Sequence, residues 1–336
     1  LQITRSTHRS EVFEALIEAA GTLGAHWVED ITTAGIQTAG RSQYTVDRRG
    51  RRVSSYEAFI VPVLRRPNLT VITDCQVESI DIEAGRATAI RCRANGQELI
   101  YAATRDVILS AGVYKSPQLL QLSGIGPGGL LAEHGVPVVR DLPAVGANLC
   151  DHQKLGISFD LHNSPGINRE FVGWRLYANA LRYFLSGTGP LARVGLPLTI
   201  MISSDGQPDW PDLQIAAAPF AMRTVKEMAA NPGSPISDKP GISFGGYHLH
   251  PKSRGAVTIT SRDVKESPLI DSGLWSDPYD QQKALTLLKM LRALAAAPSL
   301  RRFIGKERVP GADIVSDEEL IEGLGQMVDP GVHGTG

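Results

Sequence analysis

The sequence predicts a protein of the mixed α/β class with two domains, and three observations lead to this prediction. The chain has 336 residues, which is enough for two domains of ordinary size. Residues 107–124 combine a short apolar strand with a helix, the repeating unit of open α/β sheets. Short β-prone runs precede this unit, and a long helical pattern at residues 280–297 follows it.

The first predicted element is an amphipathic helix over residues 10–23. Apolar residues recur in it at helical spacing, and Gly24 follows as a stop signal. The members of this stripe are Val12, Phe13, Leu16, Ile17 and Ala20. A single apolar stripe predicts a helix that packs one face against a larger body.

A β-meander is predicted next. Its β-prone runs are LTVITD (69–74), VESIDI (77–82), RATAIRC (86–92) and ELIYAA (98–103). Asn95-Gly96, between the last two runs, is a strong signal for a tight hairpin turn.

The segment after the meander predicts a ligand crevice. Residues 107–109 are an unbroken apolar run, which is typical of a strand buried on both faces. The small residues 110–112 then let a ligand approach the backbone closely. Ser116 is predicted as the N-cap of a helix, with Pro117 at its first position and Gly124 at its left-handed end. A crevice beyond a strand end, next to a helix N-terminus, favours a ligand with negative charge.

A second domain, a mixed sheet with helices, is predicted over about 154–309. The loop PAVGANLCDH (143–152) closes the first region, and later strand runs are spaced farther apart. These runs are DLQIAAAPF (212–220), ISFGGYHLH (242–250) and AVTITS (256–261). The long helix at residues 280–297 carries its apolar face on Leu285, Leu288, Leu291 and Leu294.

The overall composition gives no signal for several classes of partner. The formal net charge is −1, with 34 basic against 35 acidic residues, so no global field indicates nucleic acid or an anionic membrane. The local run DRRGRR (47–52) is interpreted as a solvated turn in preference to a phosphate-binding patch. Three cysteines without CxxC spacing argue against a disulfide framework or a zinc site. The sequence contains no run of 18 apolar residues, so it predicts no membrane-spanning helix.

Other features favour ordinary structural roles. GIGPGG (124–129) fits GxGxxG only superficially, because it follows a helix instead of opening one after a strand. His248 and His250 favour a polar strand face over a metal site, since no third ligand stands nearby. The aromatic and sulfur-bearing residues Trp210, Phe220 and Met222 favour a core role over a substrate pocket.

The run GVYKSPQLLQLSGIGP (112–127) resembles the second signature of the glucose-methanol-choline (GMC) oxidoreductases, flavoenzymes that oxidise alcohols with FAD. Further runs stand in the order found in that family, so the resemblance covers nearly the whole chain. They are residues 50–80, LPAVGANLCDH (142–152), HPKSRGAVTITS (250–261), PLID (268–271) and VHGTG (332–336).

The resemblance implies FAD as the cofactor and assigns cofactor-binding roles. Ser110, Ala111 and Gly112 would flank the flavin with little more than backbone. Val77 would offer its main-chain amide and carbonyl to the adenine edge. Asn148 belongs to a loop that would pack under the isoalloxazine, where it and its neighbours Asp151 and His152 are expected to hold the loop.

The resemblance also implies a fold and four regions. The fold is a doubly wound FAD-binding domain, incomplete here, with a substrate domain on a mixed or antiparallel sheet. Residues 1–62 would associate with the substrate domain, 63–153 would be part of the FAD-binding domain, 154–309 would form the substrate-binding domain, and 310–336 would begin the return to the FAD-binding domain.

The implied activity is oxidation of an alcohol, with hydride passing to flavin N5 and a histidine accepting the hydroxyl proton. The FAD-binding βαβ unit is expected before residue 1, and the catalytic histidine beyond residue 336. His333 resembles the first residue of an HxxGT stretch and is not assigned as the base, so no catalytic residue and no metal ligand is assigned in this chain. A lyase on the same fold and a non-catalytic module are the alternatives.

The expected partners are a small-molecule alcohol and an electron acceptor, oxygen or another, without nucleic acid or a membrane span. The sequence leaves open which alcohol is oxidised and the oligomeric state. It also leaves the compartment open, with the cytoplasm favoured.

Overall fold

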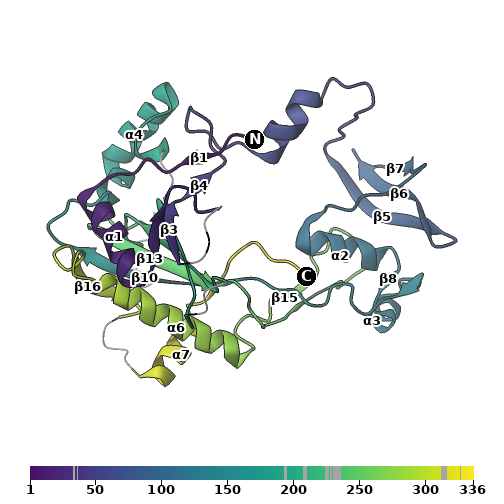
Figure 1. The fold of residues 1–336 in the computed structure, drawn as a ribbon. Coiled ribbons are helices and arrows are strands. Elements are labelled where there is room, and N and C mark those ends of the chain that lie inside the picture. Colours follow the sequence, from purple (N-terminus) through teal and green to yellow (C-terminus); the bar gives the residue numbers. More distant parts are fainter. Residues whose placement is uncertain are drawn as a thin grey trace. The chain divides into compact units, whose positions relative to one another are not determined.

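The computed structural model describes the chain except residues 33, 34, 36, 193, 194, 207–209, 224–226, 228, 230–235, 312–315 and 326. The chain divides into two compact units (Figure 1). Unit 1 comprises Leu1–Arg65, Gln153–His250 and Tyr279–Asp329. Unit 2 comprises Arg66–His152, Pro251–Pro278 and Pro330–Gly336.

Unit 1 is built on a mixed sheet, largely antiparallel, with the strand order β16-β10-β13-β12-β11-β3-β2. Every pair of neighbours in this order is antiparallel except β2 with β3, which is parallel. The strands are β2 (His26–Val28), β3 (Thr38–Arg41), β10 (Gln153–Leu161), β11 (Leu198–Ile202), β12 (Leu213–Ala218), β13 (Gly241–His248) and β16 (Ile304–Val309). This mixed sheet with helices confirms the predicted fold class.

Helices complete unit 1, and two of them were predicted from their periodicity. Helix α1 (Glu11–Thr22) begins where the Ser10 hydroxyl accepts a hydrogen bond from the Phe13 amide at 3.1 Å. Helix α6 (Pro278–Ala295) buries the four leucines of its predicted stripe. The remaining elements of unit 1 are β1 (Thr4–Arg5), β4 (Gln43–Tyr44), η1 (Tyr56–Ile60), η2 (Val61–Val63), η3 (Asn168–Phe171), α4 (Gly173–Ser186), η4 (Pro190–Ala192) and α7 (Asp317–Gly325), with β17 (Asp329–Pro330) where the chain leaves the unit.

Unit 2 contains the predicted meander and the signature helix. Strands β5 (Cys75–Glu83), β6 (Arg86–Ala94) and β7 (Gln97–Ala102) pair in sequence order. Asn95 and Gly96 both adopt positive φ, 49° and 79°, as the predicted hairpin turn requires. The other elements are α2 (Gly112–Leu122), β8 (Ile125–Gly126), α3 (Gly128–Glu133), β9 (Arg140–Asp141), β14 (Ala256–Thr258) and β15 (Leu269–Asp271).

Two predicted strands of unit 2 are absent from the described structure. Residues 69–74 and 107–109 are not assigned to strands, and Ile108 is 87% exposed. A strand needs a neighbour to satisfy its backbone groups, and no described residue pairs with either segment. The prediction of a strand buried on both faces is therefore wrong for this structure.

Helix α2 begins earlier than predicted. Its first residue is Gly112, with φ of 88°, and Ser116 and Pro117 lie inside the helix instead of at its start. The side chains of Gln118, Leu119 and Gln121 are buried, so tertiary packing outweighs the local capping signal. The predicted left-handed end at Gly124 is confirmed by its φ of 81°.

Residues 251–278 belong to unit 2 by their contacts, although the sequence places them within the second domain at 154–309. The amide of Val257, in β14, donates to the carbonyl of Gly146 at 2.7 Å. The amide of Ile259 donates to the side chain of Gln121 at 2.8 Å. These bonds join the segment to the loop and helix of unit 2.

No helix among the described residues combines the length and the apolar character that crossing a membrane requires.

His248 is buried at the end of β13, with 5% of its surface exposed, and does not lie on a polar strand face as predicted. Its Nε2 lies 4.0 Å from Asp212, whose carboxylate binds Lys283 at 2.6 Å and Ser204 at 2.6 Å. Burial lowers the pKa of His248 to about 4, although Asp212 opposes this shift. Burial raises the pKa of the Asp212 carboxyl, but hydrogen bonds from Lys283 and Ser204 outweigh it, so the net pKa lies below 3.8.

The depressed pKa of His248 predicts a stability change between about pH 6.5 and pH 4. As the pH falls through this window, the unfolded chain protonates His248 while folded unit 1 does not, so the free energy of unfolding decreases. The full decrease is on the order of 3 kcal/mol. Urea unfolding at a series of pH values should show a smaller slope for His248→Gln than for the wild type. The exposed neighbour His250 serves as control, and an equal slope change in His250→Gln would contradict the assignment.

Candidate functional site

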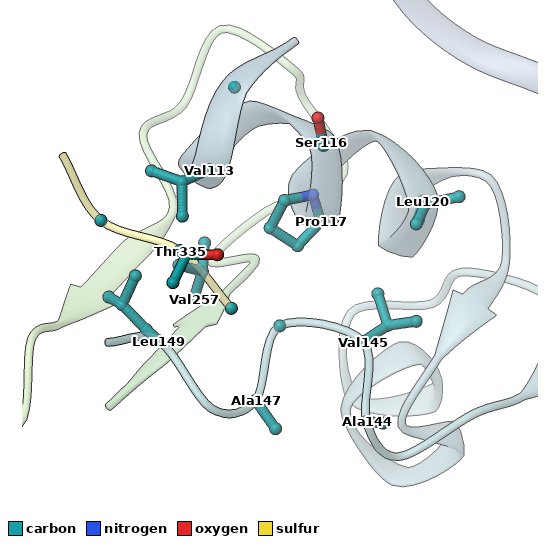
Figure 2. Close-up of a pocket in the computed structure, with 14 residues that line it drawn as sticks. Val113, Ser116, Pro117, Leu120, Ala144, Val145, Ala147, Leu149, Val257 and Thr335 are labelled. Carbon is teal, nitrogen blue, oxygen red and sulfur yellow. The ribbon is translucent and has the colours of Figure 1, made fainter. Parts of the chain in front are cut away.

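The N-terminal half of α2 borders an open pocket of about 450 Å³ in unit 2 (Figure 2). Its wall is formed by residues of 112–120, by the loop 144–149, by Val257 and by residues 334–336. None of these lining residues is charged, and most are glycine, alanine or branched aliphatic residues. The pocket therefore suits a group that presents a flat, weakly charged surface.

Gln121 connects three walls of this region. Its side chain is fully buried on α2. Its Nε2 donates to the carbonyls of Val145 at 3.1 Å and Val257 at 2.9 Å, and its Oε1 accepts from the Ile259 amide at 2.8 Å. One side chain thus satisfies three backbone groups from two segments that are more than 100 residues apart in sequence.

Gly146 lets the loop approach this side chain. Its φ is 86°, and a Cβ at this position would collide with the Val257 carbonyl oxygen and the Gln121 amide nitrogen. Only glycine satisfies both the backbone conformation and the close approach.

The end of the chain is held against the loop 148–152. Cys150 and Thr335 exchange backbone hydrogen bonds at 2.7 and 2.8 Å. The buried Asp151 carboxylate accepts from the amides of His152 at 2.8 Å, Val332 at 3.0 Å and His333 at 3.4 Å. These bonds position residues 334–336 along the pocket.

The imidazole rings of His152 and His333 lie next to each other beside residues 334–336. The Nδ1 atoms of His152 and His333 lie 3.1 Å apart, and the Asp151 carboxylate lies 3.8 Å from His333 Nδ1. At most one proton lies between the two nitrogens, so one ring donates and the other accepts. Because His333 precedes Gly334 of the pocket wall, the two imidazoles lie next to the pocket.

The predicted cofactor-binding residues fall in different parts of unit 2. Gly112 lines the pocket, and Ser110 and Ala111 lead into it as exposed residues. Asn148 adjoins the pocket on an exposed position with φ of 61°. Val77 lies on β5 and does not line the pocket.

Gln121, Gly146 and Val257 were not identified from the sequence. The local sequence signals are a glutamine inside the apolar run QLLQL and a glycine in PAVGANL. Neither signal shows which backbone carbonyl the residue approaches in the fold. Likewise, the pairing of His152 with His333 spans 181 positions and leaves no mark in the local pattern.

Two other predictions concern unit 1. Trp210 is 76% exposed and Met222 is 42% exposed, so the predicted core role is wrong for both. Among the described residues, no group of three His, Cys, Asp or Glu side chains is placed to hold a metal ion.

Two models of the GMC oxidoreductase family match residues 1–154 and 251–336. The oxygen-dependent choline dehydrogenase of Burkholderia pseudomallei (strain 1710b) is 31% identical over 309 residues, covering 92% of this chain and 54% of that protein. The glucose-methanol-choline family oxidoreductase mfmG of Annulohypoxylon moriforme is 30% identical over 316 residues, covering 89% of this chain and 51% of that protein. The chain thus spans about half the length of the curated relatives it matches.

Solved structures show the same fold. A formate oxidase crystal structure gives a TM-score of 0.87 at 21% identity, covering 99% of this chain and 62% of that chain. An FAD-dependent oxidoreductase from Chaetomium thermophilum gives 0.85 at 23% identity, with coverage of 99% and 63%.

Gly146→Ala should destabilise unit 2 because the added methyl group collides with backbone and occupies a left-handed conformation. The expected loss is about 2–5 kcal/mol in the free energy of unfolding. Gly129→Ala is the matched control, because Gly129 has open space and no positive φ. Urea unfolding, with hydrogen exchange to assign the loss to unit 2, measures both. Equal stability of the two variants would contradict the packing described for Gly146.

Proposed function

The chain belongs to the GMC oxidoreductase family, and on that premise we propose that the full-length protein is an FAD-dependent enzyme that oxidises a small-molecule alcohol. The observation that carries this proposal is the pocket beside α2, next to the His152–His333 pair. The names of relatives support it, since they include a choline dehydrogenase and an oxidoreductase described as FAD-dependent.

The pocket supports FAD as the cofactor. Gly112 has positive φ, and no atom lies within 4 Å of the place a Cβ would take, so a planar ring can approach its backbone. Ala147 and Leu149 supply small or aliphatic surface opposite α2 (Figure 2). In this proposal Ser110, Ala111, Gly112 and the 144–149 loop, with Asn148, would flank the isoalloxazine ring.

In this proposal the two units have different roles, cofactor binding and substrate binding. Unit 2, which includes most of residues 63–153, is assigned to FAD binding, and unit 1, which includes most of residues 154–309, to the substrate. The β-prone segments 69–74 and 107–109 form no strand among the described residues, and in this proposal further parts of the full-length protein would pair with them.

When bound, FAD supplies the hydride acceptor. The backbone at Gly112 and in the 144–149 loop would orient the ring, and the apolar wall would shield its face from water. The alcohol proton must pass to a base, because an alcohol does not ionise at neutral pH.

Two positions for this base are proposed. The resemblance implies a histidine beyond residue 336. A second candidate in this chain is the His152–His333 pair, since His333 directly precedes Gly334 of the pocket wall and Asp151 lies 3.8 Å from its Nδ1. In this arrangement His333 would take the proton, His152 would orient its ring, and Asp151 would hold its backbone amide.

Anaerobic mixing of the FAD-loaded full-length protein with a panel of alcohols tests this function. We expect loss of the oxidised flavin's visible absorbance with at least one alcohol. His333→Asn should slow this reduction by about 10²- to 10⁴-fold if His333 is the base, with FAD content unchanged.

Reduction at near wild-type rate in His333→Asn would move the base to the downstream histidine. Turnover of a cyanohydrin without any flavin reduction would favour the lyase alternative. Absence of both activities in the full-length, FAD-loaded protein would overturn the enzymatic proposal.

Substitutions at Val77 test the proposed contact between its backbone and the adenine of FAD. In the described residues β5 pairs only with β6, and the register shifts between Val77 and Ser79, so backbone groups on the open edge can meet a purine. Val77→Ala should leave the FAD dissociation constant nearly unchanged. Val77→Pro removes the amide donor and should raise the constant by about two- to tenfold or more.

Titration of the apo full-length protein with FAD measures both variants, and melting temperatures of the apo forms control for folding. Equal effects of the two substitutions would contradict a backbone contact at Val77.

A further inference from the structure

Helix α4 (Gly173–Ser186) lies at the periphery of unit 1 (Figure 1). One face of this helix is apolar and exposed to solvent. Trp174, Tyr177, Leu181, Phe184 and Leu185 are between 61% and 81% exposed. Their spacing of three, four, three and one positions puts them on a single side of the helix. We call these five residues the α4 stripe.

The helix is fixed to unit 1 by polar contacts on its other side. Asn179 is its one buried residue, and its Nδ2 donates to Glu170 at 3.0 Å (backbone carbonyl) and 2.9 Å (side chain). The Tyr183 hydroxyl donates to the carbonyl of Gly50 at 3.2 Å. The α4 stripe is therefore held outward by the packing of the unit.

The contact with Gly50 brings the basic turn DRRGRR (47–52) to the C-terminal end of α4. Asp47 accepts from the backbone amides of Arg49 at 2.8 Å and Arg51 at 2.9 Å, so its carboxylate holds the turn. All four arginines of the turn are exposed, and Asp47 is the one acidic residue of the turn. Arg49 and Arg51 border the same surface hollow as Phe184 and Leu185.

The charge pattern identifies the occupant of this surface. Helix α4 contains two arginines and no acidic residue, and the turn adds four more arginines. Exposed Trp, Tyr, Phe and Leu beside arginines are the composition of helices that lie in the headgroup region of a bilayer. Arg175 of α4 already pairs with Glu170 at 3.4 Å. A second copy of α4 would bring no acidic residue to the arginines of the turn, so it would leave their charges without a partner.

We infer that the α4 stripe and the 47–52 turn form a docking surface for anionic phospholipid bilayers. The apolar side chains would enter the boundary between headgroups and acyl chains, and the guanidinium groups would pair with lipid phosphates. This surface lies within unit 1, involves no residue of the pocket in unit 2, and is independent of the proposed function.

Flotation of the full-length protein with vesicles tests the inference. We expect binding to vesicles of phosphatidylcholine and phosphatidylglycerol in equal parts, weaker binding to phosphatidylcholine alone, and release by added salt. Arg49→Gln with Arg51→Gln should weaken binding by about tenfold to thirtyfold. Phe184→Ser with Leu185→Ser should weaken it by at least about tenfold.

Matched controls keep the result specific. Arg65→Gln with Arg66→Gln removes two exposed charges elsewhere, and Leu269→Ser with Ile270→Ser removes two exposed apolar side chains from unit 2. Both should leave vesicle binding unchanged. Brominated lipid should quench a fluorescence component that is lost in Trp174→Phe.

Failure of the full-length protein to float with either vesicle would overturn the inference. Equal binding by the α4 variants and the controls would also overturn it. A dimer in solution that Phe184→Ser with Leu185→Ser dissociates, without vesicle binding, would assign the surface to a second copy of the chain instead.

Discussion

The buried side chain of Gln121 is the interaction on which the pocket of unit 2 depends. A glutamine side chain offers two donors and one acceptor group, and here three backbone groups use them. Its removal would leave buried carbonyls of Val145 and Val257 and the amide of Ile259 without this partner, at a cost of about 1–3 kcal/mol each. Gly146 belongs to the same arrangement, because a larger residue would displace the amide nitrogen of Gln121.

This constraint explains why the pocket presents so much backbone. The helix, the 144–149 loop and β14 approach closely only where side chains are small, and those positions then form the wall. A separate set of hydrogen bonds brings two histidines together beside the pocket. Asp151 binds three backbone amides, and these bonds bring His333 next to His152 across 181 positions of sequence.

Local pattern predicted much of the fold. Helices α1 and α6 and strands β5, β6 and β7 carry periodicity, capping and turn signals that act within a few residues. The segments 69–74 and 107–109 show the limit of this approach, because β-propensity does not supply the neighbouring strand that a buried position needs. The start of α2 was misplaced for a related reason, since burial of Gln118 and Gln121 outweighs the capping residue Ser116.

The candidate site was predictable only in part. Small residues around Gly112 indicated a ligand crevice, and Gly112 does line the pocket. The partners that shape the pocket come from segments far away in sequence, and a single chain gives no signal for such pairs. The same holds for the basic turn 47–52, whose proximity to the α4 stripe rests on the contact between Tyr183 and Gly50.

Hydrogen exchange of the full-length protein with and without FAD tests the central claim most directly. If FAD occupies the pocket built around Gln121, amides in 110–117, 144–149 and 333–336 become protected when FAD is added, while those of α4 do not change. Protection elsewhere, with unchanged exchange in these three segments, would contradict the account.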